Sequence, residues 1–213
     1  MIEHAHGLIL RTRPLTETSL IVHWLTPEFG RFSTVARGAR RPRSPFRGKL
    51  DLFYLAYFAF IRSRRSELHT LTEVSLRETH AALRQELARL QQASSCAALV
   101  EQATEIETPL PAIFELMRNL LSVLSQNPPQ PRNIFAFELK LLNELGLKPD
   151  LVNSRLTPGT EKIMKALLEN DWRKISQLQL SGPQNTELNR FLHGFLIYHL
   201  ERIPRGRNAA LGI

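Results

Sequence analysis

The spacing of apolar residues changes near Thr79, and this change limits the chain to two kinds of structure in succession. Before Thr79, short segments rich in Leu, Ile, Val, Phe, Tyr and Thr are separated by turns. After Thr79, apolar residues recur at helical spacing, as at Leu83, Leu87 and Leu90. The pattern therefore predicts two domains, a β-structure over residues 1–78 and a helical domain over residues 79–213.

Five strand-like segments precede the change. Turn signals such as Pro14 and the run from Pro27 to Gly30 separate them. The segments are Gly7–Arg13, Ser19–Thr26, Arg31–Arg37, Leu50–Ile61 and Leu68–Leu76. Five short strands in about 75 residues suggest a small closed barrel, and the OB-fold is the leading candidate.

Proline residues and the residues before them mark most of the expected helix starts. Thr108 and Thr157 are predicted N-caps, each followed by proline in the first helical position. The expected helices start near Ala81, Pro109, Pro131, Pro158 and Thr186. The predicted fold class is therefore α+β, an N-terminal OB-fold β-barrel followed by an all-α helical domain.

The predicted barrel carries a strongly basic loop. Between Gly30 and Leu50 there are seven basic residues and no acidic residue. They are Arg31, Arg37, Arg40, Arg41, Arg43, Arg47 and Lys49. Gly and Pro hold the centre of this run out of regular structure, so we expect an arginine-rich loop suited to the phosphate backbone of a nucleic acid. The alternative is a solvated basic loop without a ligand.

The distribution of charge favours the first interpretation. Residues 1–80 carry a net charge of +6 and residues 81–213 only +2, which is typical of a polyanion-binding module joined to a domain with another task. Further arginines at strand ends could contribute to the same positive face. The candidate nucleic-acid-binding residues are Arg11, Arg13, Arg37, Arg40, Arg41, Arg43, Phe46, Arg47, Lys49, Arg62, Arg64 and Arg65.

One aromatic residue stands apart from the others near this loop. Phe32, Tyr54 and Phe58 lie in strand-like segments, so we expect them in the barrel core. Phe46 lies between proline and arginine residues, where burial is least expected. An exposed ring there could stack on a base, an interaction that contributes about 1–3 kcal/mol per base.

The residues of known catalytic sites are missing from the sequence. The histidines do not show metal-ligand spacing, and neither a phosphate loop nor a nucleophile elbow is present. Asp51, Glu67, Glu73 and Glu78 lack the spacing of a two-metal site. We therefore expect a protein that is not an enzyme and that holds no metal or cofactor.

Targeting signals are absent as well. The longest apolar run, Leu52–Ile61, is strand-sized and far shorter than the roughly 20 residues that span a bilayer. The single cysteine, Cys96, is compatible with a reducing compartment. The expected localisation is cytoplasmic, without a membrane partner.

Several stretches of the sequence, in their order and spacing, carry a resemblance to a known family. They are Leu8–Arg13, Glu17–Val22, Leu25–Arg31, Val35–Ser44, Arg47–Leu50 with Phe53, Ser66–Glu73 and, more loosely, Leu145–Leu151. The most specific part is the run from Ala36 to Ser44. With these pieces the chain resembles the RecO family of bacterial DNA repair proteins, and the resemblance covers nearly the whole chain.

The resemblance implies a recombination mediator with an N-terminal OB-fold and a helical domain. Such proteins bind and anneal single-stranded DNA, engage the single-stranded DNA-binding protein, and with RecR help to load RecA. The implied partners are single- and double-stranded DNA, RecR, the C-terminal tail of the single-stranded DNA-binding protein and, indirectly, RecA. The implied localisation is the cytoplasm, associated with the nucleoid.

The sequence departs from the family pattern at one place. Many members follow the segment that corresponds to Leu145–Leu151 with a four-cysteine zinc module. Here residues 151–159 contain no cysteine, so we expect the module to be truncated or lost.

A partner site in the helical domain is a further hypothesis. The stripe that includes Phe137 and Leu141 is most simply a core, but a groove beside Met117 could receive the acidic tail of the single-stranded DNA-binding protein. The candidate partner-binding residues are Met117, Arg118, Arg132, Phe137, Lys140 and Leu141.

Two other functions remain open from the residues alone. The same barrel could serve a general nucleic-acid chaperone, including one for RNA, because phosphate contacts and stacking suit both nucleic acids. The basic loop could also meet an acidic protein, in which case the chain is an interaction adaptor.

Overall fold

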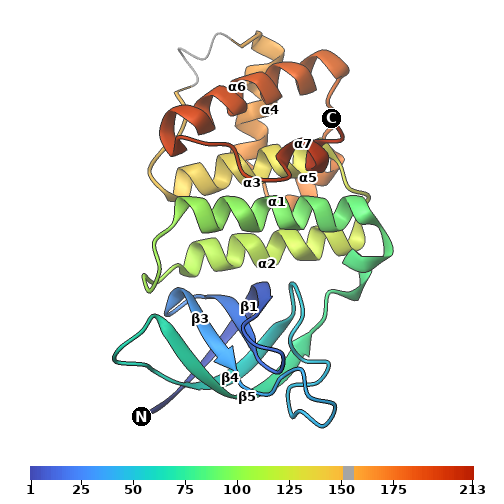
Figure 1. The fold of residues 1–213 in the computed structure, drawn as a ribbon. Helices are drawn as coiled ribbons and strands as arrows, with labels where there is room; N and C mark the ends of the chain where they lie inside the picture. The colour runs from blue at the N-terminus through green and yellow to red at the C-terminus, as the bar shows by residue number, and fades with distance from the viewer. Residues whose placement is uncertain (151–155) are drawn as a thin grey trace. The chain divides into compact units, whose positions relative to one another are not determined.

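The computed structural model describes residues 1–150 and 156–213. Residues 151–155, where the zinc module of the family that the sequence resembles would begin, lie outside the described residues. The chain forms two compact units (Figure 1). The barrel unit comprises Met1–His80 and Thr104–Glu115, and the helical unit comprises Ala81–Ala103 and Leu116–Ile213.

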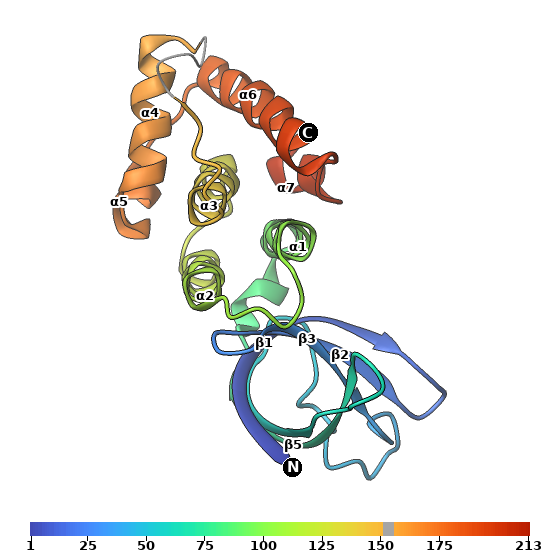
Figure 2. The ribbon, with the colours of Figure 1, turned by 90° about the vertical axis from the view of Figure 1, so that its left-hand side faces the viewer.

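The barrel unit contains five strands, as the sequence predicts. They are β1 (Ile2–Pro14), β2 (Leu20–Thr26), β3 (Gly30–Ala36), β4 (Leu55–Ile61) and β5 (Leu68–Glu78). The strands join in the order β1-β2-β3-β5-β4, and β4 pairs with β1, so the barrel closes, as Figure 2 shows nearly end-on. Only the β3–β5 pair is parallel among the strand pairs of this fully described unit. This arrangement confirms the predicted OB-fold.

Alternation of side chains along the strands builds the barrel core. In β3, buried and half-buried residues alternate with the period of two that a strand imposes. The expected core residues Phe32 and Phe58 are buried. Trp24 stacks on Phe58 with ring centroids 3.9 Å apart, and its Nε1 donates to Thr34 Oγ1 at 2.8 Å. The one polar group of the indole is therefore satisfied inside the core.

The long strand β1 closes the barrel because it pairs with two different strands. The first half of β1 pairs with β4 and the second half with β2, with a register shift after Ile9. Gly7 lies where the strand changes partner, and a Cβ there would meet Thr26 Cγ2 at 2.7 Å and Leu25 O at 2.8 Å. The glycine thus permits the close backbone approach that the change of partner requires.

The helices follow in the expected order. They are η1 (Ala81–Gln85), α1 (Leu87–Ala103), α2 (Pro111–Gln126), α3 (Pro131–Glu144), α4 (Pro158–Glu169), α5 (Trp172–Gln177), α6 (Gly182–Leu200) and α7 (Arg207–Leu211). α3 contacts α1, α4, α5, α6 and α7, and so forms the centre of the helical unit (Figure 2). The predicted starts at Pro131 and Pro158 are confirmed.

Several boundaries differ from the prediction, and β1 starts at Ile2 rather than Gly7. β4 starts at Leu55 rather than Leu50, because the preceding residues form turns with Phe53 at a φ of 62°. α2 starts at Pro111 rather than Pro109. α6 starts at Gly182, where Ser181 and Gln184 form a reciprocal capping box.

The last helix, which the sequence does not predict, is fixed by a buried ion pair. Arg207 of α7 donates from Nε and Nη2 to the carboxylate of Glu138 at 2.6 and 2.9 Å. Its Nη1 donates to Asn189 Oδ1 at 2.6 Å. Burial raises the pKa of Glu138, and the Arg207 guanidinium opposes this shift. Arg207 thus links α7 to α3 through Glu138 and to α6 through Asn189.

Candidate nucleic-acid interface

The arginine loop, residues 37–49, is a succession of turns between β3 and β4. Backbone N–H groups of Arg41, Ser44, Arg47 and Lys49 each donate to the carbonyl three residues earlier, at 3.0 to 3.2 Å. These bonds give the loop a defined backbone even though it is neither helix nor strand. The guanidinium groups therefore project from an ordered scaffold.

The expectation that Phe46 is exposed is wrong. Its side chain is only 6% exposed and belongs to the barrel core, together with Trp24 and Phe58. The loop has to cover the core between β3 and β4, and one large apolar side chain in its middle does so. Phe46 therefore holds the arginine loop on the barrel and does not offer its ring to a base.

A hollow of about 400 Å³ lies beside the buried ring. Leu20, Ala39 and Leu50 supply an apolar lining, and the arginines of the loop stand around it. Its lining arginines are Arg40, Arg41 and Arg47. An apolar floor with guanidinium groups around it can accept the sugar or base of a nucleotide while the arginines meet phosphates.

The arginine loop is joined to the loop between β1 and β2. The backbone N–H of Arg40 donates to Thr18 O at 2.9 Å, and its Nη1 donates to Thr16 O at 3.0 Å. Gly38 N also donates to Ser19 Oγ at 3.4 Å. Both loops therefore lie at one end of the barrel. Arg40 has a structural role there, as does Arg47, whose Nη1 donates to Pro42 O at 3.2 Å.

Three arginines of the loop are exposed, and their guanidinium groups have no bonding partner among the residues that the structure describes. Arg37, Arg41 and Arg43 make no side-chain hydrogen bond or ion pair within residues 1–150 and 156–213. An uncommitted guanidinium loses no internal bond when it contacts a phosphate. These three side chains are the best placed of the predicted residues to hold a nucleic-acid backbone.

A histidine that the sequence prediction missed lies beside Arg11 and Arg13. Strand register places Arg11 opposite His23, and His23 opposite Ser33, on the outer face of β1, β2 and β3. His23 Nδ1 lies 2.9 Å from Ser33 Oγ, while its buried Nε2 has no partner in the described structure. Burial, and after it the charges of Arg13, Arg11 and Arg31, together lower the pKa of His23 from 6.5 to about 4. The part of this lowering that comes from the three arginines reflects their positive charge around His23.

Arg31 does not belong to the exposed basic surface, although the sequence groups it with the loop. Its Nε donates to Thr104 Oγ1 at 2.7 Å, and its Nη2 donates to Thr104 O. Glu107 N donates to Arg31 O at 2.8 Å. The segment 104–110 passes so close to Gly30, whose φ is 62°, that a Cβ there would lie 1.7 Å from Thr108 O. Arg31 fixes this returning segment on the barrel.

The β4–β5 loop lies at the other end of β1, so the expected single positive face is not formed. Ile61, just before Arg62, pairs with Ile2, whereas Pro14, just after Arg13, pairs with Leu20. Arg64 and Arg65 are exposed in this loop. The structure thus separates the predicted nucleic-acid-binding residues into two groups. Arg11, Arg13 and the arginine loop lie toward one end of β1, and the β4–β5 loop with its arginines lies at the other end.

Arg62 is committed to ion pairs in the barrel unit. Its Nε lies 2.9 Å from Glu3 Oε1, and its Nη1 lies 2.9 Å from Glu107 Oε2. The hydrogen bond to Glu3 is the main reason that the pKa of Arg62 is raised. Glu107 also pairs with His69 Nε2 at 2.9 Å. Arg62 therefore stabilises the returning segment, like Arg31.

The predicted groove in the helical unit is not an open surface. Met117, Phe137 and Leu141 are at most 1% exposed, because the apolar stripes of these helices form the core. The expectation that these three residues line a groove is therefore wrong, and the alternative expectation of a bundle core is confirmed.

Two of the predicted rim cations bond to backbone carbonyls instead. Lys140 Nζ donates to Leu168 O and Asn170 O, each at 2.8 Å, at the C-terminal end of α4. Arg132 Nη2 donates to Ser176 O at 2.9 Å. Burial lowers the pKa of both side chains. Arg118 is exposed on α2.

The residues present do not fit the zinc module of other family members. Residues 147–158 contain neither cysteine nor histidine, and Cys96 is buried in α1. In the part of the chain that the structure describes, no group of three His, Cys, Asp or Glu side chains could hold a metal ion. Among the described helices, none is both long and apolar enough to cross a membrane.

The five-stranded barrel and the helices that follow it place the chain among OB-fold proteins with an appended helical unit. Residues 1–80 match the model of the recombination protein O N terminal, and residues 84–155 match that of its C terminal. The chain belongs to the RecO family of DNA repair proteins.

Individual relatives agree with this assignment. The DNA repair protein RecO of Exiguobacterium sibiricum is 31% identical over 95% of this chain and 82% of its own length. That of Symbiobacterium thermophilum is 28% identical over 92% of this chain and 91% of its own length. That of Bacillus subtilis is 31% identical over 71% of this chain and 58% of its own length. The resemblance found in the sequence is therefore confirmed.

Proposed function

We propose that the chain is a recombination mediator that binds and anneals single-stranded DNA. With RecR, it helps to load RecA onto DNA coated by the single-stranded DNA-binding protein, acting in the cytoplasm at the nucleoid without catalysing a reaction itself. The DNA repair role follows from the family. The annealing activity and the partners are parts of this proposal.

The observation that carries the proposal is the arginine loop. It is held on the barrel by Phe46 and on the β1–β2 loop by Arg40, and it presents Arg37, Arg41 and Arg43 to solvent. OB-folds bind oligonucleotides on the face of their second and third strands and on adjoining loops. Arg11 and Arg13 extend the basic surface toward that face.

Annealing requires a surface that neutralises two strands without fixing their sequence. Guanidinium groups on a loop neutralise phosphates in any sequence, and an apolar hollow accepts any base or sugar. The hollow beside Arg41 and Arg47 offers both features. The surface is therefore suited to bringing complementary strands together.

An annealing assay tests the function directly. Complementary DNA strands, bare or coated with the single-stranded DNA-binding protein, are mixed with the protein with and without RecR, and matched RNA strands run in parallel. We expect faster annealing of both bare and coated DNA. Annealing of RNA alone would indicate a general RNA chaperone, and binding of neither nucleic acid would indicate a protein adaptor.

A further inference from the structure

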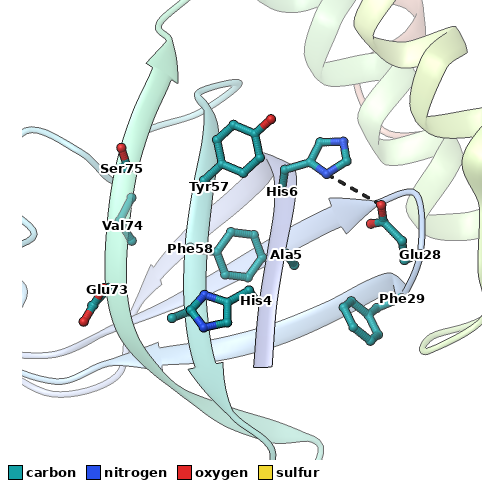
Figure 3. A pocket seen from close by; sticks show the side chains of 11 residues that line it. His4, Ala5, His6, Glu28, Phe29, Tyr57, Phe58, Glu73, Val74 and Ser75 are labelled. Carbon is teal, nitrogen blue, oxygen red and sulfur yellow. Dashed lines mark ion pairs between the residues drawn. The ribbon is translucent and has the colours of Figure 1, made fainter. Parts of the chain in front are cut away.

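A second hollow, of about 470 Å³, lies on the barrel unit and shares no residue with the arginine loop (Figure 3). Three neighbouring strands and the β2–β3 turn build it. Its size falls within the range of about 300–1,000 Å³ that is typical of small-ligand sites. We call it the acidic hollow, for the carboxylates of Glu28 and Glu73 that line it.

Strand register explains why the surface is hollowed there. His4 on β1 pairs with Ala59 on β4, which pairs with Glu73 on β5. The next row holds His6, Tyr57 and Ser75. Residues directly opposite one another share a face of the sheet, so the short side chain of Ala59 stands among longer neighbours.

The chemistry of the lining is unlike that of the rest of the barrel unit. Phe29, Phe58 and Ala59 give it an apolar and aromatic surface, and neither lysine nor arginine lines it, in a part of the chain that the structure describes completely. Residues 1–80 nevertheless carry a net charge of +6. A phosphate backbone is disfavoured here, because exposed carboxylates repel it.

The two carboxylates are available to an incoming cation. Glu28 is exposed, and its Oε1 lies 3.7 Å from His6 Nδ1, too far for a hydrogen bond. Glu73 is exposed and has no ion-pair partner among the described residues. In Figure 3, His6 stands between Tyr57 and Glu28 on one side of the hollow.

The aromatic wall already attracts a guanidinium of this chain. Arg77 Cζ lies 4.4 Å from the centroid of the Tyr57 ring, the geometry of a cation–π contact. Arg77 already engages this ring, so the charge of an incoming cation would be met by the two carboxylates of the hollow. Its aliphatic stem would cover Ala59 and Phe29, and its charged head would meet Glu28 or Glu73.

We propose that the acidic hollow binds an arginine or lysine side chain of a protein partner. This surface lets the barrel hold a basic segment of another protein while the arginine loop holds DNA. The proposal rests on the hollow alone and stands or falls independently of annealing.

Nuclear magnetic resonance of the full chain with short peptides tests the proposal. The probes are N-acetyl-Gly-Arg-Gly-amide, its lysine form and its glutamine form, and the signals followed are the Ala59 and Val74 methyl groups and the Tyr57 ring. We expect saturable shifts with the arginine and lysine peptides and none with the glutamine peptide. In a Glu28→Gln/Glu73→Gln variant, binding should weaken about fivefold, as expected for two exposed ion pairs.

A matched control uses Glu105→Gln, which removes an exposed carboxylate of the same unit outside the hollow. It should leave the affinity for the arginine peptide unchanged. Equal shifts with the glutamine peptide, or an unchanged affinity in the double variant, would overturn the proposal. So would shifts of these signals by oligodeoxythymidine but not by the arginine peptide, because the hollow would then be a base-binding site.

Discussion

Arg40 Nη1 donates a hydrogen bond to the carbonyl oxygen of Thr16 at 3.0 Å, and this bond joins the arginine loop to the β1–β2 loop. The backbone N–H of Arg40 reinforces the link through Thr18 O. Two loops that are separate in sequence thus act as one surface. Variants that test DNA binding should therefore remove the uncommitted arginines and leave Arg40 in place.

Replacing Arg41 and Arg43 with alanine should weaken binding to single-stranded DNA of every sequence. With about 0.7 counterions released per phosphate contact, the slope of log K against log salt should flatten by about 1.4. Fluorescence anisotropy of a labelled oligonucleotide over a series of salt concentrations measures the slope. The matched control, Arg173→Ala with Arg205→Ala, removes two exposed arginines of the helical unit and should leave the slope unchanged. An unchanged slope in the loop variant would remove the loop from the site.

Phe46→Ala should destabilise the barrel by about 3–5 kcal/mol, because it leaves a cavity in the core. Phe46→Leu should retain most of the stability, since it keeps most of the buried volume. Urea denaturation followed by tryptophan fluorescence measures both. A Phe46→Ala variant that keeps its stability but loses DNA binding would show that the ring contacts a base instead.

His23 should stay neutral until the pH approaches 4. Its folded-state pKa of about 4 lies below its ordinary value of 6.5, so the unfolded chain takes up a proton first as the pH falls. The stability that depends on neutral His23 is thus complete above pH 6.5 and is lost as the pH falls toward 4.

The ring signals of His23 in a nuclear magnetic resonance titration check this expectation. Arg13→Ala should raise the pKa of His23, because it removes a neighbouring positive charge. Arg173→Ala, in the helical unit, should not change it. A titration midpoint near 6.5 in the unmodified protein would contradict both the burial of His23 and the effect of the neighbouring arginines.

Arg207→Ala should destabilise the helical unit by about 3–5 kcal/mol, since it leaves the carboxylate of Glu138 buried without its partner. The double variant Arg207→Met/Glu138→Leu should be more stable than the single one, because it removes both buried charges. Thermal unfolding of the unmodified protein and of both variants measures their relative stability. Arg205→Ala, an exposed neighbour, should change the stability by less than about 0.5 kcal/mol. Equal stability of the single and double variants would contradict the predicted cost of the unpaired buried carboxylate.

Local patterns made the barrel and most helix starts predictable. The alternation of buried and half-buried side chains in β3 involves only a few neighbouring residues. The same holds for the prolines that start α3 and α4, Pro131 and Pro158. Such local signals can be recognised in the sequence. The capping box of Ser181 and Gln184 is equally local, but the predicted start near Thr186 missed it. The start at Pro111 was missed because Pro109, two residues earlier, gives the same signal.

The roles of single residues in the candidate site depend on distant partners. Arg31 is bonded to a residue 73 positions away, and Arg62 to one 45 positions away, so sequence spacing could not separate them from the exposed arginines. Phe46 is buried although its neighbours in the sequence are exposed, because the loop folds back over the barrel core. His23 lacked any signal in the sequence, since its low pKa arises from burial and from arginines on β1 and β3.

The segment 104–110 bears on where this chain can be divided. It follows α1 in the chain, yet its bonds to Arg31, Arg62 and His69 belong to the barrel unit. A fragment of residues 1–80 would lack this piece of chain, and Arg31 and His69 would lose the partners that it supplies. A barrel produced on its own therefore needs residues from two separate stretches of the sequence, 1–80 and 104–115.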